Sequence, residues 1–287
     1  MNNDFTAEII KKAAEEGFVL INRRDISYGV QLTFERGGQR DMIRLYENTK
    51  GKRSIDTSLT KSDKLKALAG GTHQSAENPL LAPPLIGSDE AGKGDWLGPL
   101  TVCALYADEV MYEKLAASGV KDSKKLTPGK IEKLKDEILA VCPHYSIIVI
   151  TPSEFNRLYE QKKNINLILT AAHAAAIKSV YAKSGCGRVL IDKFAPEYRI
   201  AGELGDYPLE IHQENRAEAN FAVAAASILA RYTYMAKLKQ MSEKYGIDFP
   251  PGAANAANTA AGQFAAKYGK EFLGDICKIS FKNTQKI

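Results

Sequence analysis

Short apolar runs alternate with long helical stretches between residues 85 and 245, and this alternation limits the possible folds more than any other feature of the chain. Strands are expected where the runs are apolar and bounded by turn residues, at 85–88, 100–106, 145–150, 188–191 and 209–212. Helices are expected over 128–141, 165–183 and 217–245, the first of which begins at a proline. Strands that alternate with helices are typical of an α/β sheet domain with helices on its faces.

The chain before residue 85 has a different pattern. Residues 4–16 place apolar side chains at helical spacing, whereas 28–34 and 42–46 mix apolar with polar residues as half-buried strands do. Gly37-Gly38 lies between these strands as a turn signal. The pattern predicts a small α+β domain.

The length of 287 residues also fits two unequal domains, at roughly 150 residues per domain. We expect the small domain over 1–65, a linker over 66–84 that ends at Pro83-Pro84, and the α/β domain over 85–287.

Composition excludes several classes of protein. With 45% hydrophobic and 25% charged residues, the chain is neither disordered nor collagen-like nor a disulfide scaffold. No apolar run approaches the roughly 20 residues that span a bilayer, and the first 16 residues are too charged for a secretory signal. We therefore expect a cytoplasmic protein with no membrane partner.

The positions of the cysteines and histidines and the net charge limit the kinds of metal site and partner that the chain can have. The four cysteines form no CxxC pair and the four histidines show no metal-ligand spacing, so a metal site would need carboxylates. The net charge is +5, and residues 1–70 hold an excess of three Lys and Arg over Asp and Glu. This mild basic balance is compatible with a phosphate-rich partner.

Two adjacent acids, Asp89 and Glu90, end the first apolar run of the α/β domain. Like charges in one partly buried place repel each other unless a cation neutralises them, and a divalent metal is such a cation. Gly92, Lys93 and Gly94 follow, so the backbone can turn sharply and an anion can approach a lysine closely. The alternative interpretation is an acidic turn in which the glycines serve only the backbone geometry.

Two further acids and two lysines are also candidates for the site. Asp192 closes a second apolar run, and Glu218 begins the alanine-rich helix expected over 217–245. Ligands in open α/β sheets gather at strand ends, so Asp89 and Asp192 are expected at one edge of the sheet. Alternatively, Asp192 caps a turn and Glu218 only stabilises a helix dipole. Lys124 and Lys125 precede a helix N-terminus, where they suit phosphate binding or form a solvated loop.

Four blocks in this order resemble a known family. They are Gly87-Ser88-Asp89-Glu90-Ala91-Gly92-Lys93-Gly94, Asp122-Ser123-Lys124-Lys125-Leu126, Leu190-Ile191-Asp192 and Ala224-Ala225-Ala226-Ser227-Ile228. The chain resembles the type 2 ribonucleases H over about 200 residues from Leu85 onward, and within them ribonuclease HIII. The N-terminal extension, the Lys163-Asn164-Ile165-Asn166-Leu167 segment and the ending Ser280-Phe281-Lys282-Asn283-Thr284 favour ribonuclease HIII over ribonuclease HII.

The resemblance implies a ribonuclease H-like mixed sheet flanked by helices, preceded by a TBP-like substrate-binding domain. It implies catalytic, metal-binding acids at Asp89, Glu90, Asp192 and Glu218, with Mg²⁺ or Mn²⁺ as cofactor. The implied reaction is endonucleolytic hydrolysis of the RNA strand of an RNA/DNA hybrid, leaving 5′-phosphate. No obligate protein partner is implied, and we expect a monomer.

Phosphodiester hydrolysis agrees with this set of residues. Two divalent ions about 3.5 to 4 Å apart can neutralise the phosphorus centre and activate water, and hard oxygen ligands suit Mg²⁺ or Mn²⁺. We expect Asp89 to bridge the ions, Asp192 and Glu218 to hold one each, and Glu90 to complete the site on the substrate side. Gly92, Lys93 and Gly94 would meet the strand that carries 2′-hydroxyls, and Lys124 and Lys125 its phosphates.

Two departures from the family pattern leave alternatives open. Lys193 stands where ribonuclease HIII is expected to have Gln, and the interval from Glu218 to Ser227 is one residue shorter, which makes Glu214 the alternative fourth acid. The nearest alternative function is ribonuclease HII-like incision at single ribonucleotides embedded in duplex DNA. The other is a hybrid-binding protein without catalysis.

Overall fold

The protein is described by a computed structural model, which covers residues 3–26, 29–47, 53–57, 60–62, 64–65, 82–120 and 126–287. The chain divides into two compact units, Met1–Pro79 and Leu80–Ile287. The expected domain limits at residues 65 and 85 bracket this division. Most of the expected linker, residues 66–81, lies outside the described residues.

The smaller unit is one helix on an antiparallel sheet in the order β1-β2-β3-β4. Its elements are α1 (Asn3–Glu15), β1 (Val19–Ile26), β2 (Gly29–Arg36), β3 (Gln39–Glu47) and β4 (Arg53–Asp56). Side chains of β2 alternate between buried and half-buried, so Val30, Leu32 and Phe34 form the core with the helix. The helix and the hairpin at Gly37-Gly38 occur as expected, whereas strand β1 was not anticipated, because only its two ends are partly buried.

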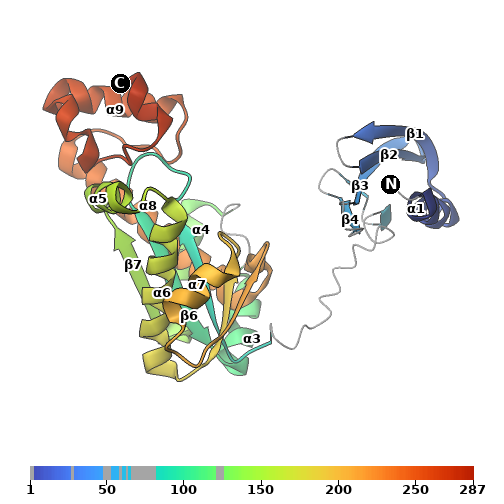
Figure 1. Ribbon diagram of the computed structural model, residues 1–287, viewed down its shortest axis with the longest axis horizontal. Helices are drawn as coiled ribbons and strands as arrows, with labels where there is room; N and C mark the ends of the chain where they lie inside the picture. The colour runs from blue at the N-terminus through green and yellow to red at the C-terminus, as the bar shows by residue number, and fades with distance from the viewer. Residues whose placement is uncertain are drawn as a thin grey trace. The chain divides into compact units, whose positions relative to one another are not determined.

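The larger unit is built on a mixed sheet, of which Figure 1 labels β6 and β7. The strand order is β7-β6-β5-β8-β9. Its strands are β5 (Leu85–Ala91), β6 (Leu100–Ala107), β7 (Tyr145–Ile150), β8 (Arg188–Asp192) and β9 (Glu210–Glu214). Strands β5, β6 and β7 pair antiparallel, and β5, β8 and β9 pair parallel. All five expected strands are present.

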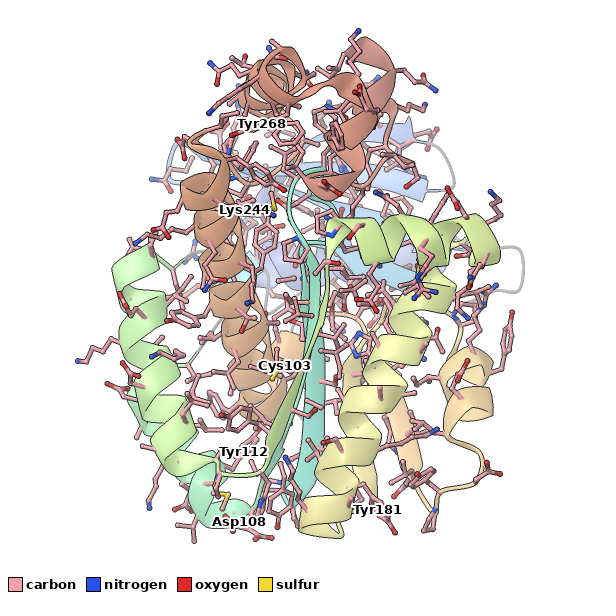
Figure 2. All side chains as sticks on the ribbon, turned by 90° about the vertical axis from the view of Figure 1, so that its left-hand side faces the viewer. Cys103, Asp108, Tyr112, Tyr181, Lys244 and Tyr268 are labelled. Carbon is pink, nitrogen blue, oxygen red and sulfur yellow. The ribbon has the colours of Figure 1, made fainter. Side chains whose placement is uncertain are left out.

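Helices cover both faces of this sheet. They are α3 (Glu109–Ser118), α4 (Pro128–Val141), α5 (Pro152–Lys162), α6 (Ile165–Ser184), α7 (Glu197–Leu204), α8 (Phe221–Tyr245) and α9 (Asn255–Tyr268). Figure 2 shows the sheet nearly edge-on, with α4 and α8 on one side and α6 on the other. Adjacent residues of one strand therefore enter different cores: Leu190 packs with α8, whereas Val189 and Ile191 pack with α6.

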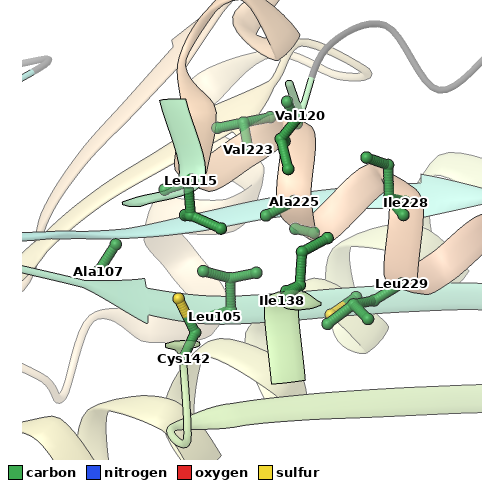
Figure 3. Close-up of a cluster of buried hydrophobic side chains, with 14 of the residues drawn as sticks. Leu105, Ala107, Leu115, Val120, Ile138, Cys142, Val223, Ala225, Ile228 and Leu229 are labelled. Carbon is green, nitrogen blue, oxygen red and sulfur yellow. The ribbon is translucent and has the colours of Figure 1, made fainter. Parts of the chain in front are cut away.

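Alanine lets α8 lie close to β5. Residues 222–226 are all fully buried, and the core around them is drawn in Figure 3. A Cβ on Gly87 would stand 2.5 Å from the backbone of Ala222, so no larger residue fits there without movement. This close approach brings the α8 residues that follow, Ser227 among them, to the end of β5.

The long helix expected over 217–245 begins later than predicted. Residues Ala217–Ala219 form a separate 3₁₀ turn, and α8 starts at Phe221. Asn220 has extended backbone angles and its side chain accepts a hydrogen bond from the N–H of Ala222, so it caps the helix and interrupts the run. Glu218 therefore lies in the turn before the helix, not in its first turn.

Helix α6 is long and apolar enough to cross a membrane, yet half of that stretch is buried inside the unit. It packs against the sheet as a core helix, and its N-cap is Asn164, whose side chain accepts from the N–H of Asn166.

Candidate active site

The strand ends that carry the predicted acids lie side by side. Strands β5 and β8 pair parallel with Ser88 opposite Ile191, so Asp89 and Asp192 occupy the next position on the two strands. Both line a hollow of about 290 Å³, together with Glu90. Its other lining residues are Ala91, Gly92, Lys93, Gly94, Asp95, Ser227, Arg231, Tyr234, Met235 and Pro251.

Asp89 is held in an electrostatically unfavourable place. Burial, the neighbouring charge of Glu90 and the charge of Asp192 raise its pKa to about 8, against the lowering effect of hydrogen bonds from the Ser227 hydroxyl and the Glu90 N–H. The Glu90 N–H lies 2.7 Å from Asp89 Oδ1. A buried carboxyl in this position either keeps a proton at neutral pH or needs a positive charge beside it.

Glu90 has the opposite balance. Burial disfavours its charged form, but a hydrogen bond from His173, the charge of His173 and the nearby Lys93 together lower its pKa. Nε2 of His173 lies 3.2 Å from one carboxylate oxygen of Glu90, and Nζ of Lys93 lies 3.6 Å from the other. The two adjacent acids therefore differ: the surroundings of Asp89 disfavour its charged form, whereas those of Glu90 favour it.

Asp192 is bound to the turn that carries Glu218. Its Oδ1 accepts a hydrogen bond of 2.9 Å from the N–H of Ala217, next to Glu218 in the chain. The turn is entered through Arg216, a non-glycine residue with φ of 62°. Glu214 lies opposite Asp192 on the neighbouring strand β9. Both alternatives for the fourth acid are therefore close to Asp192 along the chain or across the sheet, but neither lines the hollow with Asp89.

The two glycines after the acids have different surroundings. Gly92 has φ of +85°, and a Cβ there would lie 2.4 Å from the carbonyl oxygen of Pro99. The fold itself therefore requires glycine at this position. Gly94 is exposed, and a Cβ there would meet no described residue within 4 Å, so a side chain at this position would leave the described part of the fold undisturbed and could contact an approaching molecule.

The loop that follows is fixed by residues from much later in the chain. Lys278 is fully buried and its Nζ donates to the carbonyl oxygens of Asp95 at 2.8 Å and Gly98 at 2.9 Å. The backbone of Trp96 accepts from the Lys278 N–H, and its indole N–H donates to Thr284. Gly98 donates to the carbonyl oxygen of Ile276. The segment around 276–284 thereby holds the far side of the hollow.

Not every predicted residue can be placed. Lys124 and Lys125 lie in 121–125, outside the described residues. Sequence reasoning gave no role in the site to His173, Arg231, Tyr234 and Lys278, which come from distant segments, and it named Ser227 only as part of a family block. The available signals were a lone histidine in an apolar helix and a serine in an alanine run, and neither says which strand it will meet.

The oxygen-rich lining fits a hard divalent cation. Carboxylates without thiols or imidazoles as ligands suit Mg²⁺ or Mn²⁺, and the charges that act on the buried Asp89 are those of two further acids, Glu90 and Asp192. Within the described residues, no three histidine, cysteine, aspartate or glutamate side chains already lie close enough together to hold a metal. The fit therefore comes from the donor chemistry and the charge of the hollow.

Comparisons with known proteins agree about what this chain is similar to. Residues 86–284 match the protein family described as Ribonuclease HII. The chain is 40% identical over 206 residues to a Ribonuclease HIII of Protochlamydia amoebophila (strain UWE25), which covers 71% of this chain and 68% of that protein. It is 35% identical over 228 residues to a Ribonuclease HIII of Bacillus cereus (strain 03BB102), and the match covers 74% of this chain and 73% of that protein. The solved structure of Bst-RNase HIII in complex with Mn²⁺ matches with a TM-score of 0.67 and 25% identity, over 100% of this chain and 95% of that one.

Proposed function

Because the chain belongs to the ribonuclease HII family, and within it to the ribonucleases HIII, we propose that the hollow at the ends of β5 and β8 is its active site. The protein is a metal-dependent endoribonuclease that hydrolyses the RNA strand of RNA/DNA hybrids, with Mg²⁺ or Mn²⁺ as cofactor. The expected ribonuclease H-like mixed sheet, preceded by a small α+β domain, is confirmed with it.

The observation that carries the site assignment is the pairing of Asp89 with Asp192 on adjacent parallel strands, with Glu90 beside them in one hollow. Asp89, Glu90, Asp192 and Glu218 would hold the divalent cations, with Glu214 as the alternative to Glu218. When bound, these cations neutralise the charge that develops on the phosphodiester and make a water molecule more acidic. The carboxylates of this chain supply the negative charge that retains the cations and orient them relative to the substrate.

Other residues of the hollow would bind the substrate. Gly94 leaves room for a backbone to approach, and Lys93 lies between it and Gly92. The buried Nε of Arg231 has no hydrogen-bond partner in the described part of the chain, and a phosphate oxygen would provide one. Lys124 and Lys125 would contact backbone phosphates further along the strand.

The smaller unit would add affinity through charge. Arg36, Arg40 and Lys61 line a hollow of about 660 Å³ near the tip of the β2-β3 hairpin, together with the buried acid Asp41. Cations in such a place can bind phosphates of either strand without reading their sequence. We propose that the enzyme works as a monomer without an obligate protein partner, in the cytoplasm.

Substitution of Asp89 by asparagine tests the site. Asp89→Asn keeps the shape but removes one negative ligand, and loss of several kcal/mol of charge stabilisation corresponds to a drop in kcat of roughly a thousandfold. Hybrid binding, measured by fluorescence anisotropy, should change little. Asp136→Asn is the matched control, because Asp136 is an exposed aspartate on α4.

The same assay includes a duplex with one embedded ribonucleotide beside a long hybrid. Cleavage of the hybrid is expected to be faster. Preference for the single ribonucleotide would favour ribonuclease HII-like incision, and cleavage of the hybrid by Asp89→Asn at the wild-type rate in Mg²⁺ would remove Asp89 from the site.

A further inference from the structure

His173 is a fully buried polar residue in the middle of the apolar helix α6. Both of its ring nitrogens have partners on strand β5. Nδ1 lies 2.8 Å from the hydroxyl of Ser88, and Nε2 lies 3.2 Å from Oε2 of Glu90. The imidazole therefore connects two residues that stand two positions apart on the same strand and point to the same face.

The Ser88 hydroxyl fixes the orientation of this ring. Its single proton is directed to the carbonyl oxygen of Cys103 on the neighbouring strand β6, at 2.9 Å. The oxygen of Ser88 is then left to accept from Nδ1 of His173, and because Glu90 accepts from Nε2, both ring nitrogens carry a proton in this arrangement. Through one hydroxyl, the imidazole is tied to the hydrogen-bonded backbone of the sheet.

A second contact holds the ring from its face. Phe194, two residues after Asp192, stacks on His173 with ring centroids 4.7 Å apart and planes inclined by 11°. The ammonium of Lys93 lies 5.7 Å from the centroid of the same Phe194 ring and 3.6 Å from Oε1 of Glu90. Each oxygen of Glu90 thus has its own partner, and both partners contact Phe194.

We propose that His173 is a positioning residue, which holds the Glu90 carboxylate in the orientation needed to receive a divalent cation. The proposal rests on the proposed function of Glu90 as a metal ligand. A glutamate has three rotatable bonds, and a hydrogen bond from a rigid neighbour to one oxygen removes most of that freedom before the cation arrives. Groups that orient a ligand in this way commonly change metal affinity about 10- to 100-fold when they are removed.

If His173 merely filled the core, a different result would be expected. An aromatic ring of similar size would then serve equally well, because the stacking on Phe194 and the packed volume would be retained. His173→Phe keeps the ring and loses both nitrogens, whereas His173→Gln places an N–H near the position of Nε2 and loses the ring.

The test measures Mn²⁺ binding to the full-length protein without substrate, by isothermal titration calorimetry. His173→Phe should weaken Mn²⁺ binding about 10- to 100-fold. His173→Gln should weaken it less, and in the cleavage assay excess Mn²⁺ should restore kcat of both variants with KM for the hybrid unchanged. The matched control is His212→Phe, since Nε2 of His212 lies 3.3 Å from Oε1 of Glu210 outside the hollow, and its Mn²⁺ affinity should equal that of the wild type.

A double-mutant cycle shows whether His173 acts through Glu90. In a Glu90→Gln background, His173→Phe should have little further effect on Mn²⁺ affinity. Full additivity, or wild-type affinity for His173→Phe alone, would overturn the proposal. If His173→Phe does not fold by circular dichroism, Ser88→Ala decides, because it removes the anchor of the ring and should weaken Mn²⁺ binding in the same direction.

Asp89→Asn separates this proposal from the assignment of the site. If Asp89→Asn leaves Mn²⁺ binding unchanged, the metal site itself is wrongly placed. If Asp89→Asn weakens Mn²⁺ binding and His173→Phe does not, the site stands and only the positioning proposal fails.

Discussion

The two units of the molecule place their candidate functional charges differently. In the smaller unit the arginines and lysines lie near the surface, and the ion pair between Arg40 and Glu35 joins side chains that are 76% and 41% exposed. In the larger unit, Asp89 and Glu90 are enclosed at a strand end and Lys278 has no exposed surface.

The difference teaches where chemistry and affinity reside. An exposed cation is solvated and can move to meet a phosphate, but each one contributes little to the structure. A buried charge is disfavoured by desolvation, so it persists only where fixed partners or a bound ion compensate it. We therefore expect substitutions in the larger unit to change turnover or stability, and substitutions in the smaller unit to change binding.

The identity of the fourth acid gives the largest expected effect. Glu218→Gln should lower kcat on a hybrid by about a hundredfold, because it removes one charge that would hold a cation. Glu214→Gln, the matched control on β9, should lower kcat by less than about threefold. Steady-state kinetics in Mg²⁺ decides between them, and the reverse order would assign the fourth ligand to Glu214.

The buried lysine should make stability depend on pH. Burial lowers the pKa of Lys278 to about 8, against the raising effect of Asp95. Between pH 8 and 10.5 the unfolded chain therefore holds a proton that the folded chain has released, so stability rises with pH in this window.

Relative to Lys278→Met, the wild-type free energy of unfolding should rise by about 3 kcal/mol across that window. Urea unfolding at several pH values measures the difference. A difference that is constant with pH would mean that Lys278 stays charged in the folded protein, and the contrast between buried and exposed cations would lose its strongest example.

The smaller unit is tested by removing three of its exposed charges. The triple variant Arg36→Gln, Arg40→Gln and Lys61→Gln should raise KM about tenfold with kcat nearly unchanged. It should also reduce the slope of log affinity against log salt by about 0.9 for each phosphate that the variant no longer neutralises. Lys11→Gln with Lys12→Gln on α1 is the control. Equal slopes for both variants would show that the hollow near the hairpin does not touch the hybrid.

The smallest effect is expected at Gly94. Gly94→Ala should raise KM about threefold without changing the melting temperature, because the new methyl group would meet no described residue and would face the substrate. Gly92→Ala should instead destabilise the protein, since φ is +85° and the Pro99 oxygen is too close. A lower melting temperature for Gly94→Ala would show that this glycine also serves the fold.

Much of the fold could be predicted because it is local. The apolar runs that end in Asp89 and Asp192 are readable in the sequence, and the strand-end rule brings the two acids together, as the register of β5 and β8 does. Helix α4 begins at Pro128 as expected, since proline suits the first turn. The interruption before α8 was missed, although Asn220 followed by an apolar run is a capping signal.

The surroundings of the acids could not be predicted, because they depend on contacts between distant segments. His173 and Lys278 each lie more than 80 residues from the residues they bind, and nothing in their local sequence selects those partners. Residues 66–81 and 121–125, which include Lys124 and Lys125, lie outside the described structure, so the substrate-binding assignments made there stay predictions.

The buried lysine also has a consequence for the newly made protein. Lys278 is synthesised 183 residues after Asp95, the loop residue it binds, which is roughly 10 to 40 seconds later at usual rates of translation. A nascent chain that has emerged from the ribosome as far as α8 already contains all the candidate metal-binding acids. The loop at residues 95–98 still lacks its contacts with the segment around 276–284. The contacts that hold this loop can therefore form only late in biosynthesis, well after the acidic residues have been made.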